Sequence, residues 1–166
     1  MDTTKDIIVF TEHENKKKCS IHPLSKRGDL EFINCIRIEE GHITIPDCYL
    51  FLHVEGKPLG KEDFNRPLLL LDASWRRAIK LAQLPAIDAL EKRSIGDFIT
   101  SYPRVSKLYS MPGAGLASVE ALYAARLIQG REDTSLLDYY YWKNPFLETN
   151  QALICAWQNV WKESKK

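Results

Sequence analysis

Leu68-Leu69-Leu70-Leu71-Asp72-Ala73-Ser74-Trp75-Arg76-Arg77 is the stretch that decides the fold, because an apolar run ends there in polar and aromatic side chains. Four consecutive leucines favour a central strand that is covered on both faces of its sheet. In open α/β sheets, ligands bind outside the carboxyl ends of such strands. We therefore expect Asp72 and Trp75 to lie where a small molecule would bind.

The same residues have a purely structural alternative. Asp72 or Ser74 would be a good cap for a helix that begins near Trp75. Such a helix would carry basic residues on a solvated face, namely Arg76, Arg77 and Lys80. The spacing fits helix capping and ligand binding equally well.

The composition is that of an ordinary folded domain. The chain has 166 residues, of which 45% are hydrophobic and 27% are charged, and its net charge is +1. This balance argues against disorder and against a strongly basic coat, so an RNA-binding surface would have to be a local patch. No apolar run approaches the roughly 18 residues of a membrane-spanning helix. Because the first residues also lack the order of a signal peptide, we expect a cytoplasmic protein that does not bind membranes.

The cysteines predict free thiols. Cys19, Cys35, Cys48 and Cys155 are widely and irregularly spaced, unlike the cysteines of a disulfide framework. Cys19 and His22 have the separation of a metal-binding pair, but no second close pair accompanies them. We therefore expect no metal site.

The order of expected elements indicates an α/β protein. The expected strands are residues 6–10, 31–38, 42–45, 49–54, 68–72 and 94–100. The expected helices are residues 75–84, a stretch from Leu116 to a stop at Gly130, 135–141 and 150–163. Between them, the long loop 104–115 is expected to be functional. We expect a small N-terminal β-rich lobe at residues 1–60 and a second domain at residues 61–166.

Two further features have structural interpretations. Glu120 lies near the amino end of an expected helix, where the helix dipole favours a carboxylate. The cluster Tyr139-Tyr140-Tyr141-Trp142 could stack nucleic-acid bases, although packing between helices is the favoured interpretation.

Six motifs stand in one order along nearly the whole chain. They are Lys17-Lys18-Cys19-Ser20 before Leu24, Thr44-Ile45-Pro46, Leu71-Asp72-Ala73-Ser74-Trp75, Ile95 with Tyr102-Pro103, Leu116-Ala117-Ser118-Val119-Glu120-Ala121-Leu122, and Trp142 with Phe146-Leu147-Glu148-Thr149-Asn150. In this order they resemble the family of aminocarboxypropyltransferases that modify small-subunit ribosomal RNA. More distantly, they resemble the DTW-domain enzymes that modify tRNA uridines. Each motif alone is weak, and their common order carries the resemblance.

The resemblance implies a SPOUT-like parallel sheet with a C-terminal trefoil knot, and S-adenosylmethionine as the donor substrate. The implied enzyme transfers the 3-amino-3-carboxypropyl group to N3 of a uridine or pseudouridine in small-subunit ribosomal RNA, and acts as a monomer. Asp72 would lie near the donor's amino group or the acceptor nucleotide, as an anchor or as a base. Carried over by position, the residues that would bind the donor are Ser20, Thr44, Pro46, Trp75, Ile95, Leu116 and Ala121.

The acceptor is less clearly implied than the donor. Tyr102-Pro103 stands where the family has Asn-Pro, and the loop that follows is longer than in the family. The basic residues expected to contact RNA phosphates are Lys17, Lys18, Arg76, Arg104 and Lys107, although solvated charge is the commoner role of such residues. Transfer to tRNA uridine therefore stays open, as do a SPOUT-like RNA methyltransferase and a non-catalytic RNA-binding module of ribosome assembly.

Overall fold

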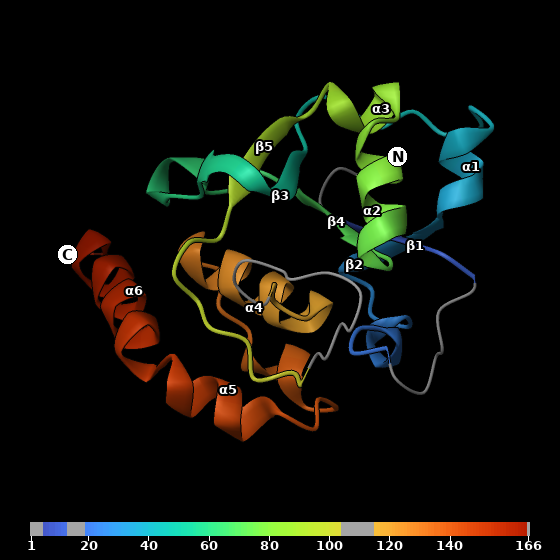
Figure 1. The fold of residues 1–166 in the computed structure, drawn as a ribbon. Helices are drawn as coiled ribbons and strands as arrows, with labels where there is room; N and C mark the ends of the chain where they lie inside the picture. The colour runs from blue at the N-terminus through green and yellow to red at the C-terminus, as the bar shows by residue number, and fades with distance from the viewer. Residues whose placement is uncertain (1–4, 13–18, 104–114, 166) are drawn as a thin grey trace. The chain divides into compact units, whose positions relative to one another are not determined.

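The computed structural model describes residues 5–12, 19–103 and 115–165. The strands are β1 (Asp6–Phe10), β2 (Leu30–Asn34), β3 (Leu50–Pro58), β4 (Leu68–Asp72) and β5 (Glu91–Ser94). The α-helices are α1 (Cys35–Glu39), α2 (Trp75–Ala82), α3 (Pro85–Asp88), α4 (Ser118–Ile128), α5 (Lys143–Thr149) and α6 (Gln151–Ser164) (Figure 1). The short 3-10 helices are η1 (His22–Leu24), η2 (Lys61–Asp63) and η3 (Thr134–Leu137).

The chain divides into two compact units, and it passes between them more than once. Unit 1 comprises the residues up to Pro58 together with Asn65–Ser94. Unit 2 comprises Leu59–Phe64 and the residues from Ile95 onward. Unit 1 therefore holds the strands and α1 to α3, and unit 2 holds α4 to α6.

Unit 1 is built on a five-stranded sheet with the strand order β2-β1-β4-β3-β5. All four pairs of neighbouring strands run parallel. Parallel strands that follow one another along the chain need long crossover connections, and helices occupy two of these connections. Along the chain, α1 follows β2 and precedes β3, and α2 and α3 follow β4 and precede β5 (Figure 1). The expected α/β class with a parallel sheet is confirmed.

β4 is the central strand that its four leucines predicted. It pairs with β1 on one side and with β3 on the other. Leu68 and Leu69 are fully buried, and Leu70 is nearly so. Since successive side chains point to opposite faces, both faces of β4 are covered. On one face, Leu69 packs in a core with Ile7 of β1 and Leu81 of α2.

The strand expected at residues 31–38 stops early because an asparagine caps a helix. The side chain of Asn34 accepts a hydrogen bond of 3.1 Å from the backbone amide of Ile36 and thereby begins α1. Asparagine is among the strongest N-cap residues. The apolar residues Cys35 and Ile38 become the buried side of that helix. Residues 42–45, also expected as a strand, form no regular element.

The strand expected at residues 94–100 is displaced toward the amino terminus. β5 ends at Ser94, where the expected strand began, and residues 95–100 have no regular secondary structure. β5 consists of polar residues, so it lacks the apolar pattern that marks a strand in sequence. Its pairing with β3 and an ion pair of 3.0 Å between Arg66 and Glu91 hold it at the sheet edge.

Unit 2 is organised around α4. Its side chains from Val119 to Ile128 are all buried, and the helix packs against η3 and α6. Gly130 follows with a φ of 77° and ends the helix as expected. The helices expected at residues 75–84 and 150–163 are confirmed as α2 and α6, whereas the one expected at 135–141 is reduced to η3.

The first three strands were expected in a lobe of their own, and they pair in one sheet with β4. The boundary expected at residue 60 falls where the chain first enters unit 2, at Leu59. The division into residues 1–60 and 61–166 and the trefoil knot stay predictions. Within the described ranges, no helix is both long and apolar enough to cross a membrane.

Candidate functional site

The carboxyl ends of β2, β1 and β4 lie level with one another. In the register, Phe10 of β1 pairs with Asn34 of β2 on one side and with Asp72 of β4 on the other. Just beyond β1, the Asn34 side-chain amide donates a hydrogen bond of 2.7 Å to Glu12 Oε1. Polar groups from three segments therefore meet at the edge where parallel sheets bind ligands.

At this edge, Asp72 is hydrogen-bonded to a thiol far away in sequence. Cys19 Sγ donates to Asp72 Oδ2 over 3.1 Å. Burial of the thiol and, next, the charge of the Asp72 carboxylate raise the pKa of Cys19 to about 11. The thiol therefore keeps its proton at neutral pH and is the donor of this bond. Ser20 follows Cys19 directly, so the bond brings this expected donor-binding residue to the edge where Asp72 lies.

The helix after β4 is capped by Ser74. Its Oγ accepts a hydrogen bond of 3.3 Å from the backbone amide of Arg77. Trp75 is then the first residue of α2, and its side chain is 46% exposed. Because Ser74 supplies the cap, capping does not require Asp72. Capping and ligand binding are therefore compatible in this stretch.

α2 is fixed against α1 and presents a basic outer face. The Arg77 guanidinium pairs with the Glu39 carboxylate and donates to Cys35 Sγ over 3.8 Å. Arg76 and Lys80 are exposed, and α2 contains no acidic residue. A cationic helix face with an accessible indole at its start is suited to phosphate and base contacts.

Pro46 lies toward the opposite end of the sheet in unit 1. Its carbonyl accepts a hydrogen bond of 3.3 Å from the amide of Tyr49, which directly precedes β3. β3 and β4 start level with each other, and about 13 Å of strand separates this level from Asp72. Within unit 1, Pro46 is therefore not grouped with Asp72 and Ser20.

Three of the expected donor-binding residues belong to unit 2. Ile95 and Leu116 are half-buried, and Ala121 is buried in α4. Ile95 begins the irregular segment after β5, and Leu116 lies two residues before the start of α4. Two buried polar side chains, Glu120 and Asn150, hold these segments in place.

Glu120 is a fully buried carboxylate at the start of α4. It accepts hydrogen bonds from Thr100 Oγ1 at 2.6 Å, from the Ser101 amide at 3.0 Å and from the Ala117 amide at 2.8 Å. The structural role expected for Glu120 is confirmed. It also reaches beyond its own helix, since it ties the segment after β5 to α4.

Asn150 fastens the irregular segment to the junction of α5 and α6. Its side chain accepts a hydrogen bond of 2.8 Å from the Ile99 amide. It donates bonds of 2.9 Å to the carbonyls of Ile99 and Phe146. These bonds replace the ladder partners that a segment outside a sheet lacks. Asn150 ends the Phe-Leu-Glu-x-Asn motif, so that motif has a structural explanation.

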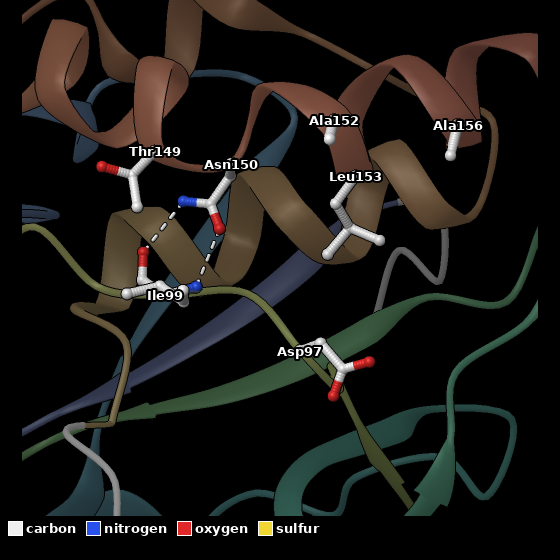
Figure 2. Close-up of a pocket in the computed structure, with 7 residues that line it drawn as sticks. All are labelled: Asp97, Ile99, Thr149, Asn150, Ala152, Leu153 and Ala156. Carbon is white, nitrogen blue, oxygen red and sulfur yellow. Dashed lines mark hydrogen bonds between the residues drawn. The ribbon is translucent and has the colours of Figure 1, made fainter.

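A shallow hollow of about 400 Å³ lies beside Asn150 in unit 2. Its walls are mainly apolar, with Asp97 as the charged group at its rim; the apolar residues are Ile99, Ala152, Leu153 and Ala156 (Figure 2). No residue expected from the sequence to bind the donor or RNA lines this hollow.

Most expected RNA contacts fall outside the part of the chain that the structure describes. These are Lys17, Lys18, Arg104 and Lys107, and the expected loop 104–115 falls outside it as well, except for Gly115. The tyrosine cluster is described, and packing explains only part of it. Tyr140 is buried, whereas Tyr139 and Tyr141 are 75% and 85% exposed.

The chemistry available in unit 1 is that of a carboxylate next to an accessible indole. Asp72 can accept a proton or bind an ammonium group, and the face of Trp75 attracts a cation. Among residues 5–12, 19–103 and 115–165, no cluster of His, Cys, Asp and Glu is suited to hold a metal ion. Cys19 was missed as a partner of Asp72, because a separation of 53 positions in the sequence hides the contact from local patterns.

The sequence matches no protein-family model and no curated protein. The fold, by contrast, is that of a solved RNA-modifying transferase. This structure is the SAM-dependent rRNA:acp-transferase Tsr3 from Vulcanisaeta distributa, with a TM-score of 0.70 and 22% sequence identity. The match covers 93% of this chain and 83% of Tsr3. At the level of the fold, it confirms the resemblance that the motifs indicated.

Proposed function

We propose that the protein transfers the 3-amino-3-carboxypropyl group from S-adenosylmethionine to a uridine-type base of small-subunit ribosomal RNA. One observation carries the proposal: Asp72 and Trp75 lie together at the carboxyl end of β4, in a chain with the fold of a SAM-dependent rRNA:acp-transferase. Neither the fold nor the pair would suffice alone, because one fold hosts many functions.

The reaction is a displacement at the carbon that joins the aminocarboxypropyl chain to sulfur. N3 of the base forms the new carbon–nitrogen bond. The carbon–sulfur bond breaks, its electrons stay on sulfur, and methylthioadenosine leaves. Attack on the methyl carbon of the same donor would instead leave S-adenosylhomocysteine. The enzyme therefore selects the reaction by which carbon it presents to the acceptor.

Trp75 and Asp72 fit this selection. The half-exposed indole offers a π face to the sulfonium and an apolar wall to its methyl group. A methyl group held against that wall is turned away from the acceptor, and the longer chain is presented instead. Asp72 accepts the N3 proton or anchors the ammonium group of the chain, and a carboxylate suits both roles.

The remaining contacts follow the resemblance. Ser20 binds the donor carboxylate, and its link through Cys19 to the edge that holds Asp72 supports this role. Within unit 1, the resemblance assigns contact with the adenine group of the donor to Trp75, the first residue of α2. RNA phosphates contact Lys17, Lys18, Arg76, Arg104 and Lys107, and the absence of acidic residues from α2 supports Arg76.

Labelled donor tests the proposal. The protein is incubated with ribosomal RNA and S-adenosylmethionine that carries its label either in the carboxyl group or in the methyl group. We expect only the carboxyl label to enter RNA. Methyl label in RNA without carboxyl label would show a methyltransferase, and a protein with no affinity for the donor in calorimetry would be a non-catalytic RNA-binding module.

Several finer features belong to the same proposal. The C-terminal region forms a trefoil knot. The enzyme works as a monomer in the cytoplasm, without membrane binding. Transfer to tRNA uridine is the runner-up, because Tyr102-Pro103 departs from the family pattern. Nucleoside mass spectrometry of ribosomal RNA and tRNA from a deletion strain separates the two acceptors.

A further inference from the structure

We propose that Cys19 is a positioning residue, whose thiol holds the Asp72 carboxylate in one orientation at the carboxyl edge of the sheet. The importance of this contact for catalysis rests on the proposed function. The contact itself does not, so it can be tested without any activity.

The Cys19 side chain links a turn to a strand end. Its Sγ donates a hydrogen bond to Asp72 Oδ2 over 3.1 Å. The backbone at Ile21 and His22 acts on the thiol in the opposite direction, since it lowers the pKa of Cys19, but burial and the Asp72 charge outweigh it.

The turn itself is firmly anchored. Ile21 is fully buried and Leu24 is 2% exposed. The Leu24 amide donates a hydrogen bond of 3.0 Å to the Ile21 carbonyl, which closes η1. Cys19 is thus attached to a rigid support, and Asp72 is the last residue of a strand in the sheet centre. A hydrogen bond between two such fixed points restricts the rotation of the carboxylate.

In this bond the thiol is the donor and Asp72 the acceptor. Burial and, next, the Asp72 charge raise the pKa of Cys19 to about 11, so the thiol keeps its proton at neutral pH. A carboxylate held in one orientation is what either role proposed for Asp72 requires. Ser20, next in sequence, is held at the same edge.

Thiol reactivity tests the contact directly. The full-length protein is treated with iodoacetamide at pH 8, and alkylation of each cysteine is followed by peptide mass spectrometry. We expect Cys19 to react more slowly than the exposed Cys155. In Asp72→Asn, Cys19 should react severalfold faster, because each pKa unit lost increases the thiolate about tenfold. Cys155 should be unchanged, and the buried Cys35 reports that the variant is folded by staying unreactive.

An unchanged Cys19 rate in folded Asp72→Asn overturns the proposal, whatever the enzymatic activity. If Asp72→Asn does not fold, the infrared S–H stretching band decides. The band of Cys19 is obtained as the difference between wild type and Cys19→Ala. A band at the position of a thiol bonded to a carboxylate supports the contact, and a band of a free thiol refutes it.

Steady-state kinetics then test the positioning role. Cys19→Ala should lower kcat/KM for transfer about tenfold, through kcat if Asp72 is the base and through KM for S-adenosylmethionine if it anchors the ammonium group. Cys19→Ser keeps a donor of similar geometry and should restore most of kcat/KM, and Cys155→Ala is the matched control. An unchanged kcat/KM in Cys19→Ala, or no rescue by serine, contradicts positioning. A wild-type protein without transfer would refute the proposed function and leave the alkylation result standing.

Discussion

Replacing Trp75 by alanine should weaken S-adenosylmethionine binding by one to two orders of magnitude without unfolding the protein. The indole stands at the start of α2 and is 46% exposed, so much of its surface is free for a ligand. A tryptophan that is almost half exposed has about 100 Å² left to cover. Complete cover would be worth about 2.5 kcal/mol at about 25 cal/mol per Å².

The expected loss of binding free energy differs from this value for two reasons. A bound donor covers only part of the exposed indole surface, which lowers the apolar contribution. The sulfonium adds a cation–π attraction of about 0.5–2 kcal/mol. Together they give about 1.4–3 kcal/mol, which corresponds to an increase in Kd of about 10- to 150-fold.

The assay is titration calorimetry with S-adenosylmethionine, with a thermal melt of each variant to verify folding. Trp75→Phe keeps a smaller π face and should fall between wild type and Trp75→Ala. Ile79→Ala is the matched control, because Ile79 lies one turn later on α2 and is 45% exposed. An affinity within twofold of wild type in a folded Trp75→Ala protein would refute the assignment of the indole to the donor site. An equal loss in Ile79→Ala would show that the effect belongs to the helix as a whole.

Three predictions concern the supports of unit 2. Asn150→Ala removes three hydrogen bonds to backbone groups, and urea unfolding should show a loss of about 2–4 kcal/mol; a loss below about 0.5 kcal/mol would speak against the fastening role. Glu120→Gln replaces one of the two accepting oxygens by an amide NH2 group, which cannot accept a hydrogen bond. The free energy of unfolding should fall by about 1–3 kcal/mol in the same assay, and equal stability of variant and wild type would contradict the hydrogen bonds assigned to Glu120. Gly130→Ala places a Cβ 2.7 Å from a ring carbon of Trp161 at a positive φ, so Tm should fall by about 2–4 °C for each kcal/mol of strain. Gly28→Ala is the control, because its Cβ would meet no atom within 4 Å, and it should leave Tm unchanged. Equal Tm values for the two variants would contradict the close contact between Gly130 and Trp161.

The centre of unit 1 could be predicted because its signals are local and strong. Four leucines followed by Asp72 define β4, and Ser74 is a good cap for α2. Both features depend only on residues that are close together in the sequence, so they can be recognised without knowledge of the tertiary structure. The same holds for Gly130, whose left-handed backbone ends α4.

The elements that were missed depend on partners distant in sequence. β5 is a polar strand that exists because β3 pairs with it. The segment after it looks apolar enough for a strand, but Asn150 and Glu120 satisfy its backbone instead. The contact between Cys19 and Asp72 joins two motifs that lie far apart in the sequence. Only tertiary structure brings such residues together, so their spacing in sequence carries no signal.

The identity of the small-molecule product tests the proposed transfer most directly. S-adenosylmethionine is incubated with the protein and ribosomal RNA, and the soluble products are quantified by mass spectrometry against a control without RNA. The proposed transfer predicts RNA-dependent methylthioadenosine, in equal amount to the aminocarboxypropyl groups found in RNA. RNA-dependent S-adenosylhomocysteine, or no RNA-dependent product at all, would contradict it.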